Sequence, residues 1–497
     1  MCKQTIPDTE QALKTRILLS WAALAILSAC GTVGPNYNLP QQAVLQRPSA
    51  AAQFLGSNDT AYTSEPLPAQ WWRLYQDPVL DGLIQQALAA NTDLRVAAAN
   101  LARTQAVAQE VEAGGRPVVA VSAAPSYGRA SGAANGTTKS MPAAWSHDGG
   151  LTVAYQADMF GRLARAMESA NADTQSAQAA ADLVRITVAA ETARAYADAC
   201  SALRQMTVVQ HSIDLQQHFV TLTDRRMRGG RGAAIEGTRA RSQLAQLQSG
   251  LPPLQSRHLV AHYRLAALTG LLPAEMDRHL LQCQAAPRLV SSIPVGDGAA
   301  LLRRRPDVRQ AERNLASATA RIGMATADLY PNITFGLGAG SAGSLSSVGA
   351  ANAFRWSLGP VVSWTLPSTG SARSRIMQAE AGTDSALAHF DGVVINALKE
   401  VESAMTVYAH ELSRNGALKT ARDESARASA QSQQLYRYGR IDFLSALDSE
   451  RTLAASDAAL AESDAQLTTD QIALFLALGG GWEAAAIQGN ASNAAAM

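Results

Sequence analysis

The sequence predicts a mainly α-helical protein that also carries membrane-crossing β-strands, arranged as two copies of one unit. Three observations predict this fold: helical stretches far longer than a globular helix, strand pairs that alternate apolar and small polar residues, and the recurrence of both at fixed spacing. Only 17% of the 497 residues are charged and 5% are aromatic, which is typical of a helix-rich chain with thin cores. The net charge of +1 gives no general attraction to nucleic acid.

The N-terminal segment has the pattern of a lipoprotein signal peptide. Basic residues precede an apolar run over residues 17–26, which is too short to span a membrane and typical of a signal-peptide core. The run ends in Leu27-Ser28-Ala29-Cys30, similar to a bacterial lipobox, in which the cysteine is acylated. We therefore expect a signal peptide over residues 1–29, lipidation of Cys30, and an extended tether over 30–70. An ordinary signal peptide with a chance cysteine is the alternative.

Two cysteines remain in the body of the chain. Cys200 lies in a helical run and Cys283 in a linker, at no spacing that is typical of a metal site. We expect both to be free thiols.

Four strands are expected, over residues 117–127, 150–158, 331–340 and 355–366. In the last segment, large apolar residues alternate with small polar ones. This pattern is typical of a strand with lipid on one face and water on the other, and about 9–11 residues suffice to cross a bilayer. A hairpin in a soluble sandwich is the alternative for this segment taken alone.

Long helices flank the strands. One helix is expected over 81–112, a very long one over 162–228, and a continuation over 234–270 that Pro252-Pro253 must break or kink. A helix of about 65 residues would be about 100 Å long at 1.5 Å per residue. Such a length is unusual in a globular domain.

The same order of elements occurs twice. Asp93 and Asp307 begin matching helices at an offset of 214 residues, and the glycines 230 and 439 match at an offset of 209. The change of offset falls in the hairpin tip, where insertions are tolerated. We assign the first repeat to 71–290, the second to 291–482, and a flexible tail to 483–497.

The duplication limits each chain to four membrane strands. Four strands cannot close a barrel, and an open edge in hydrocarbon leaves backbone groups unpaired at several kcal/mol each. Membrane strands therefore require oligomerisation, although the strand count alone does not choose among two, three or four chains.

Several separated motifs resemble the TolC/OprM outer-membrane factors, and the chain is most similar to their NodT-type lipoprotein branch. They are the duplicated order, the lipobox followed by Val33–Tyr37, and the runs Arg305–Glu312 and Tyr436–Leu453. The resemblance implies a homotrimer with a twelve-stranded barrel in the outer membrane and a periplasmic tunnel of helices. It implies a periplasmic adaptor (membrane fusion) protein and an inner-membrane RND pump as partners, and outer-membrane lipids around the barrel and the anchor.

The implied function is an exit duct that exports small toxic compounds or drugs and is opened by its partners. A lipid-anchored periplasmic coiled-coil scaffold or adaptor without a pore is the alternative.

The resemblance also implies a periplasmic gate. Tyr436, Leu444 and Asp448 match the family's aromatic, leucine and aspartate positions at the constriction. A ring of aspartates selects for charge, and a ring of leucines closes a pore by dewetting. Ser445 stands where some members carry a second acidic residue. Arg228 and Glu236 flank the related turn of the first repeat and are candidates for a gate-locking network.

No motif indicates an enzyme, a cofactor or a metal site. Gly338-x-Gly340-x-x-Gly343 matches a dinucleotide-binding pattern, but no helix start follows it, so we expect a flexible hairpin tip. Arg303-Arg304-Arg305 is expected to be a solvated helix entrance. The eight histidines lack metal-ligand spacing, and no nucleophile with its base is indicated.

Overall fold

The structure is a computed structural model that describes residues 31–480, apart from 58, 130, 132, 134–137, 139, 141, 231, 278–282, 284–285, 290 and 365–368. The expected signal peptide, Cys30 and the tail beyond residue 482 lie outside the described residues. The chain divides into two compact units. The sheet unit comprises 1–40, 101–176 and 311–389; the helical unit comprises 41–100, 177–310 and 390–497.

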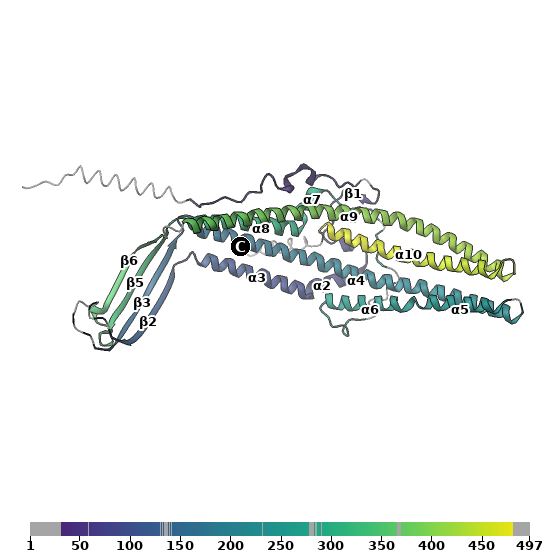
Figure 1. Cartoon of the computed structure of the whole chain (residues 1–497), viewed down its shortest axis with the longest axis horizontal. Coiled ribbons are helices and arrows are strands. Elements are labelled where there is room, and N and C mark those ends of the chain that lie inside the picture. Colours follow the sequence, from purple (N-terminus) through teal and green to yellow (C-terminus); the bar gives the residue numbers. More distant parts are fainter. Residues whose placement is uncertain are drawn as a thin grey trace, which may run out of the picture. The chain divides into compact units, whose positions relative to one another are not determined.

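The sheet unit contains one antiparallel sheet of four strands in the order β2-β3-β5-β6 (Figure 1). The strands are β2 (Val118–Gly128), β3 (Ala144–Ala157), β5 (Asn332–Ser344) and β6 (Phe354–Ser363). The central pair of strands, β3 and β5, joins the two repeats through twelve residue pairs, from Ser146↔Ser344 to Ala157↔Ile333. β2 and β6 lie at the edges, and neither has a second partner strand within the described chain.

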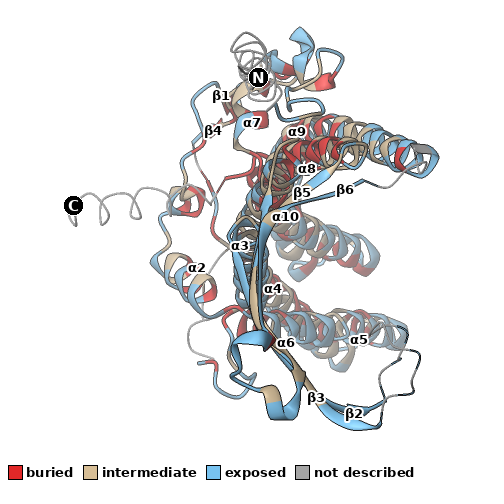
Figure 2. Ribbon diagram, turned by 90° about the vertical axis from the view of Figure 1, so that its left-hand side faces the viewer, coloured by how far each residue is buried: buried red, intermediate tan, exposed pale blue. Residues whose placement is uncertain are grey.

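The register gives the sheet two different faces. One cross-strand row consists of Val121, Leu151, Ala339 and Trp356. The adjacent row, which projects from the opposite face, consists of Ser122, Gly150, Gly340 and Arg355. The strands are coloured mostly as exposed in Figure 2, and Trp356 is 69% exposed in the single chain. The apolar face therefore has no covering element within the sheet unit.

The glycine motif at Gly338–Gly343 does not form a hairpin tip. It lies within β5, where Gly338 pairs with Thr152 and Gly340 pairs with Gly150. The expectation of a flexible loop was wrong because glycine is depleted in strands, although it is used where backbones approach closely. The strand extends to Ser344, and the loop to β6 begins only at Leu345.

The long helices have the expected positions. The first repeat contains α4 (Arg162–Arg228), α5 (Ala234–Gln248) and α6 (Leu251–Leu268); the second contains α8 (Pro306–Ala327), α9 (Thr369–Arg437) and α10 (Phe443–Ala477). No helix among the described residues combines the length and the apolar character needed to cross a membrane.

The helix expected over 81–112 is divided into α2 (Pro78–Ala90) and α3 (Thr92–Ala113). Asn91 separates them, because its side chain accepts hydrogen bonds from the amides of Asp93 and Leu94 and so caps the second helix. The same side chain donates to the backbone oxygen of Leu268 at 3.0 Å. α3 and α8 each have 22 residues, as the repeat predicts.

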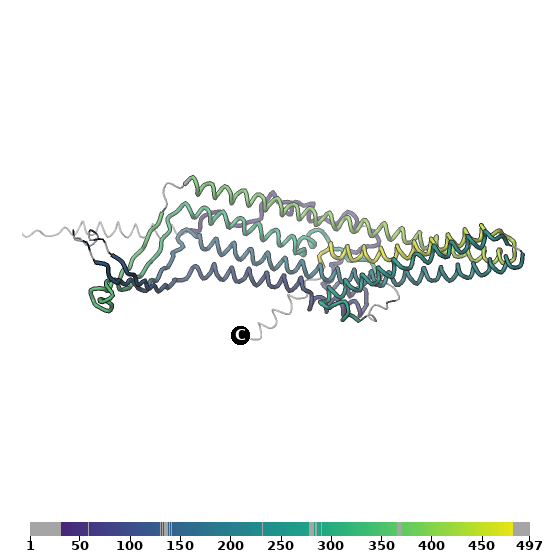
Figure 3. The backbone as a smooth tube through the Cα atoms, turned by 60° about the horizontal axis from the view of Figure 1, so that its bottom comes forward, coloured from purple at the N-terminus to yellow at the C-terminus, as the bar shows by residue number. Residues whose placement is uncertain are grey.

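The turns that end α4 and α9 lie at the same end of the helical unit (Figure 3). Gly230 and Gly439 have φ values of 70° and 71°, a left-handed conformation that glycine adopts without steric cost. The two turns, 209 residues apart in the sequence, therefore both have a glycine with the same backbone conformation.

Residues 41–75 are more structured than the extended tether expected up to residue 70. They contain three short helical turns, η1 (Val44–Gln46), η2 (Pro48–Ala51) and η3 (Trp71–Tyr75), and the strand β1 (Tyr62–Thr63). This strand pairs in parallel with β4 (Ile293–Pro294). Trp71 is fully buried and stacks on Phe475 of α10 with 4.7 Å between the ring centroids. The segment therefore belongs to the core of the helical unit.

A different segment, directly after the expected lipidation site, is held in the sheet unit. The Nε of Arg165 donates to the backbone oxygen of Val33 at 3.1 Å, and its Nη2 donates to the backbone oxygen of Gly34 at 3.0 Å. Nη2 also reaches Asn36 Oδ1 at 2.7 Å. The Arg165 side chain is only 5% exposed, so residues 33–36 are bound by a buried guanidinium.

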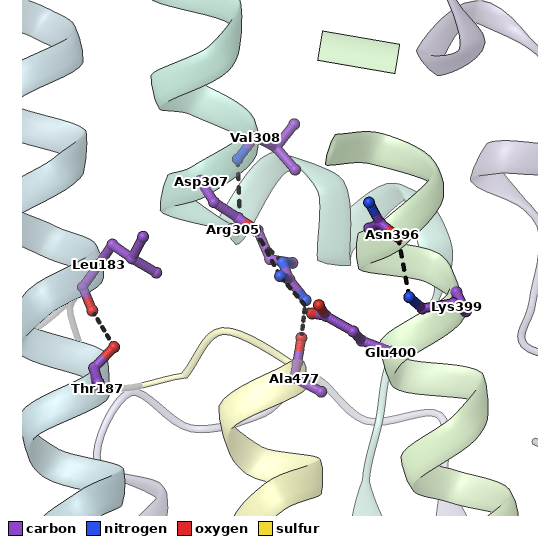
Figure 4. Close-up of polar contacts among 9 residues, drawn as sticks. All are labelled: Leu183, Thr187, Arg305, Asp307, Val308, Asn396, Lys399, Glu400 and Ala477. Carbon is purple, nitrogen blue, oxygen red and sulfur yellow. Dashed lines mark hydrogen bonds and ion pairs between the residues drawn. The ribbon is translucent and has the colours of Figure 1, made fainter. Parts of the chain in front are cut away.

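The sequence suggested that the arginine run before α8 is solvated, and this was wrong for Arg305, which is buried, although Arg303 is exposed. α7 (Gly298–Arg304) ends there, and the guanidinium of Arg305 donates to both carboxylate oxygens of Asp307, to Glu400 and to the backbone oxygen of Ala477 (Figure 4). Its side chain is 10% exposed. Because a buried charge is tolerated only when it is paired and hydrogen-bonded, Arg305 connects the start of α8 to α9 and to the end of α10.

The expectation of two free cysteines was wrong. Cys200 on α4 and Cys283 form a disulfide, with 5.4 Å between their Cα atoms. Their sequence separation of 83 residues carries no local signal of pairing. The bond joins Cys283, which follows α6 in the sequence, to a fully buried position of α4.

Reduction of this disulfide is expected to lower the free energy of unfolding by about 2–5 kcal/mol, because the bond closes a long loop in the unfolded chain. Guanidinium denaturation of detergent-solubilised protein, followed by circular dichroism, measures the change. The double variant Cys200→Ala/Cys283→Ala should have the same free energy of unfolding as the reduced wild type, and adding reductant should not change it. Identical denaturation of oxidised and reduced wild type would contradict the assignment.

Candidate functional site

The three residues matched to a gate lie at the turn between α9 and α10, but they do not share one surface. Leu444 and Asp448 are exposed on the first turns of α10, and their spacing of four residues places them on one helix face. Tyr436, near the end of α9, is 1% exposed. The structure therefore brings Leu444 and Asp448 together and places Tyr436 inside the chain.

Tyr436 belongs to an aromatic cluster that joins the two repeats. Its ring lies 5.4 Å from that of Phe219 on α4, and Phe219 stacks on Phe443 of α10 at 5.6 Å. Burial raises the pKa of the Tyr436 hydroxyl, so this side chain stays neutral over the physiological range. The cluster fixes the end of α9 and the start of α10 against α4.

Arg226, which sequence reasoning missed, makes the strongest polar contact at this turn. Its Nη1 donates to the backbone oxygen of Tyr436 at 2.6 Å, and its guanidinium carbon lies 4.3 Å from the centre of the Tyr436 ring. A single side chain on α4 thus satisfies a carbonyl at the end of α9 and stacks on the aromatic ring. The sequence offered no signal for it, since Arg225 and Arg228 lie in the same basic turn.

The two weaker candidates have no such role in the single chain. Arg228 is exposed and donates to the backbone oxygen of Asp224 in its own helix at 3.4 Å. Glu236, on the first turn of α5, is partly buried. Besides burial, the negative charge of Glu236 contributes to raising the pKa of Tyr436, but the hydrogen bond to the Tyr436 carbonyl comes from Arg226.

The start of α10 is fixed by its own cap. Asp442 accepts a hydrogen bond from the amide of Ser445 at 2.7 Å, and this bond lowers the pKa of the Asp442 carboxyl. The carboxylate also interacts favourably with the positive end of the helix dipole. The cap therefore determines where α10 begins, and with it the direction in which Leu444 and Asp448 project.

The duplication places a second pair of exposed residues at equivalent positions. Ile235 and Arg239 on α5 stand 209 residues before Leu444 and Asp448, and both are exposed. Each turn therefore presents an apolar residue followed, one helical turn later, by a charge. The charge is negative in the second repeat and positive in the first.

This site is suited to sterics and electrostatics rather than to bond chemistry. Within the described part of the chain, no group of three or more His, Cys, Asp and Glu side chains could hold a metal ion. An exposed leucine beside an exposed aspartate offers a surface that repels water at one point and attracts cations at the next.

Comparisons with known proteins identify relatives of the whole chain. A family model described as outer membrane efflux protein matches residues 83–271 and 299–480. The chain is 26% identical to nodulation protein T of Rhizobium leguminosarum bv. trifolii over 93% of this chain and 97% of that protein. It is 28% identical to the toluene efflux pump outer membrane protein TtgC of Pseudomonas putida, over 94% of this chain and 96% of that protein.

A solved structure has the same fold. The outer-membrane channel OprN aligns with a TM-score of 0.85 and 33% identity, covering 91% of this chain and 100% of that one.

Replacement of Arg226 by leucine is expected to loosen the turn between α9 and α10, because it removes the bond to the Tyr436 carbonyl and the contact with the ring. The loss amounts to about 1–3 kcal/mol, so amides at the start of α10 should exchange hydrogen about ten- to a hundredfold faster. Hydrogen exchange followed by mass spectrometry measures this. Arg228→Leu, which removes a neighbouring exposed arginine, is the matched control, and equal exchange in the two variants would refute the role of Arg226.

Proposed function

Because the chain belongs to the outer membrane efflux protein family, we propose that three copies assemble into one duct with a gate at its periplasmic end. The protein is an outer-membrane channel that forms the exit duct of a tripartite efflux system. Family membership favours this channel over the alternative, an adaptor without a pore. The assembly, the gate and the cargo go beyond that membership and rest on the arguments below.

The proposal that several chains assemble rests on the two open edges of the sheet. β2 and β6 are the edges of a four-stranded sheet, and the residues of one face are apolar and exposed. In a bilayer each unpaired backbone group costs several kcal/mol, so β2 of one chain must pair with β6 of the next. Three chains give a closed barrel of twelve strands, in which no edge is left in contact with lipid.

Exposed apolar residues on the helices support the same assembly. Leu259, Val260 and Tyr263 on α6 are 43%, 59% and 46% exposed in the single chain. They lie within five residues, and a neighbouring subunit would remove them from water. The helical tunnel is therefore completed by contacts between chains, as the barrel is.

The gate is proposed to use Leu444 and Asp448 directly and Tyr436 indirectly. Three copies of α10 around one axis would place three Leu444 side chains and three Asp448 carboxylates in adjacent rings, which close the pore by dewetting and select for cations. Tyr436 is buried against Phe219, so its role is to position α10. Arg239, the equivalent of Asp448 in the first repeat, supplies positive charges near the same aperture.

Cys30 is proposed to be acylated and to anchor the protein in the outer membrane. The segment at residues 33–36 supports this role. It follows Cys30 closely in the sequence and is hydrogen-bonded to Arg165 of the sheet unit. An acyl-bearing residue so close to a fixed point would stay near the ends of the membrane strands.

The cargo is proposed to be small toxic compounds or drugs, delivered by an inner-membrane RND pump and a periplasmic adaptor. The name of TtgC connects that relative with toluene efflux. The structure supports a broad range of solutes, since the non-lipid face of the sheet consists mainly of small residues such as Gly150, Gly338 and Gly340.

The assembly is tested by the mass and conductance of the purified protein. Native mass spectrometry in detergent is expected to give three chains per particle, because the resemblance to the family implies a trimer and a ring of chains pairs every open edge. Planar bilayers should then show single-channel steps. A monomer that forms no pore, with its strands correctly folded by circular dichroism, would contradict the proposal.

Asp448→Ala is expected to raise the resting conductance at least about twofold and to weaken block by divalent cations, because the carboxylate ring is lost. Single-channel recording with magnesium added from the periplasmic side measures both effects. Glu424→Gln, which removes an exposed carboxylate paired with Arg427 on α9, is the control and should behave as wild type. Unchanged conductance and block in Asp448→Ala would refute the gate assignment.

A further inference from the structure

The four membrane strands contain two fully charged side chains, Asp148 on β3 and Arg355 on β6. No other Asp, Glu, Lys or Arg occurs within the strand bounds that the structure gives. The two side chains are joined by a hydrogen-bonded ion pair, with 2.5 Å between Arg355 Nη2 and Asp148 Oδ1. The charges of the sheet are therefore concentrated at one place.

The ion pair crosses an intervening strand. Arg355 pairs in register with Gly340 of β5, and Gly340 pairs with Gly150 of β3, two residues from Asp148. The bridge crosses β5 between Gly340, which pairs with Arg355, and Ala342, which pairs with Asp148, so no large side chain of β5 stands between the guanidinium and the carboxylate. A Cβ at Gly340 would lie 2.5 Å from the backbone oxygen of Gly149, so this position has no room for one.

The bridge lies on the face opposite to the apolar one. Its row is offset by one residue from the row of Leu151 and Trp356, and successive residues of a strand project to opposite faces. Asp148 and Arg355 remain 53% and 60% exposed at their side chains. A hollow of about 230 Å³ beside Arg355 is lined by Ser122, Thr152, Gly338 and Ser357. Arg355 therefore borders open space, and both side chains of the pair are accessible to water.

The position along the strand is equally defined. Arg355 is the second residue of β6 and follows directly on the loop that joins β5 to β6. The opposite ends of the strands lead into the helices, so this loop lies at the outer end of a membrane barrel. The charges stand at the outer mouth of the lumen.

We propose that Arg355 and Asp148 form a charge-balanced band at the outer mouth of the duct, which determines how charged solutes interact with it. The inference rests on the proposed trimer, which repeats the pair three times around the lumen. While the pair is intact, its two charges compensate each other, and anionic and cationic solutes meet no strong trap at the exit. Loss of either partner leaves three like charges around a lumen lined by small residues, and these bind solutes of opposite charge.

The experiment uses single-channel recording of the full-length protein, with charged blockers added only from the outer side. Arg355→Gln is expected to lower the concentration of hexaamminecobalt(III) needed for half-block by about tenfold, because three carboxylates lose their partners. Asp148→Asn is expected to do the same for inositol hexaphosphate, a polyanion. The double variant Asp148→Asn/Arg355→Gln restores neutrality without restoring the bridge, and should return both values to wild type. Glu112→Gln, which breaks an exposed ion pair on α3, is the control for removal of a carboxylate elsewhere.

The outcomes separate the possible failures. If the wild type forms pores and neither single variant changes the half-block concentration by more than about twofold, the proposed band is wrong and the proposed duct stands. A double variant that deviates as strongly as the single variants would show that the bridge has a structural role, which also overturns the proposal. If neither wild type nor variants form pores, the proposed duct fails, and the band fails with it.

Discussion

The constraint on which the structure depends is the unpaired backbone of β2 and β6. Hydrocarbon offers no hydrogen bonds, so a sheet with two open edges is not stable in a bilayer as a single chain. The duplication supplies two strand pairs and joins them through β3 and β5 but cannot close the sheet. Closure has to come from other chains. The long helices, which are continuous with the strands in sequence, must then also surround a common axis, and their exposed apolar residues such as Tyr263 are consistent with that demand.

Within one chain, the helical unit has an apolar core that includes Trp71, Leu265 and Phe475, and polar contacts fix how the long helices pair. Small residues on the helix surfaces bring backbones close but bury little area, so specific pairing must come from elsewhere. Arg305 provides it between the start of α8, α9 and the end of α10, and Arg226 provides it where α4 meets the end of α9. Both arginines donate to a backbone oxygen of a long helix. Such a contact fixes the axial position of one helix relative to another, which a smooth stripe of alanines does not.

Much of the fold could be predicted from the sequence because its signals are periodic and duplicated. The bounds of α4, the presence of four strands and the matching turns at Gly230 and Gly439 follow from alternation, helix breakers and a constant offset, whereas β3 begins at Ala144 instead of residue 150 and β5 ends at Ser344 instead of residue 340. The failures concern contacts between distant segments. The Cys200–Cys283 bond, the burial of Arg305 and the packing of residues 41–75 depend on how linkers return to the helices, and no local pattern encodes that path. At the candidate gate, motif matching located the turn but could not distinguish exposed Leu444 and Asp448 from buried Tyr436.

The distribution of charge between the two units has a physical logic for a passive duct. A trap for charged solutes is useful where passage must be stopped, and harmful where solutes must leave. In the helical unit, the Asp448 carboxylate is exposed and Ser445 adds no second carboxylate beside it, so its charge is accessible to solvent. In the sheet unit, the carboxylate of Asp148 is paired with the guanidinium of Arg355 across strand β5. If the chain assembles as proposed, three balanced pairs stand at the exit and three exposed Asp448 carboxylates stand at the gate, so the duct is selective at one end and indifferent at the other.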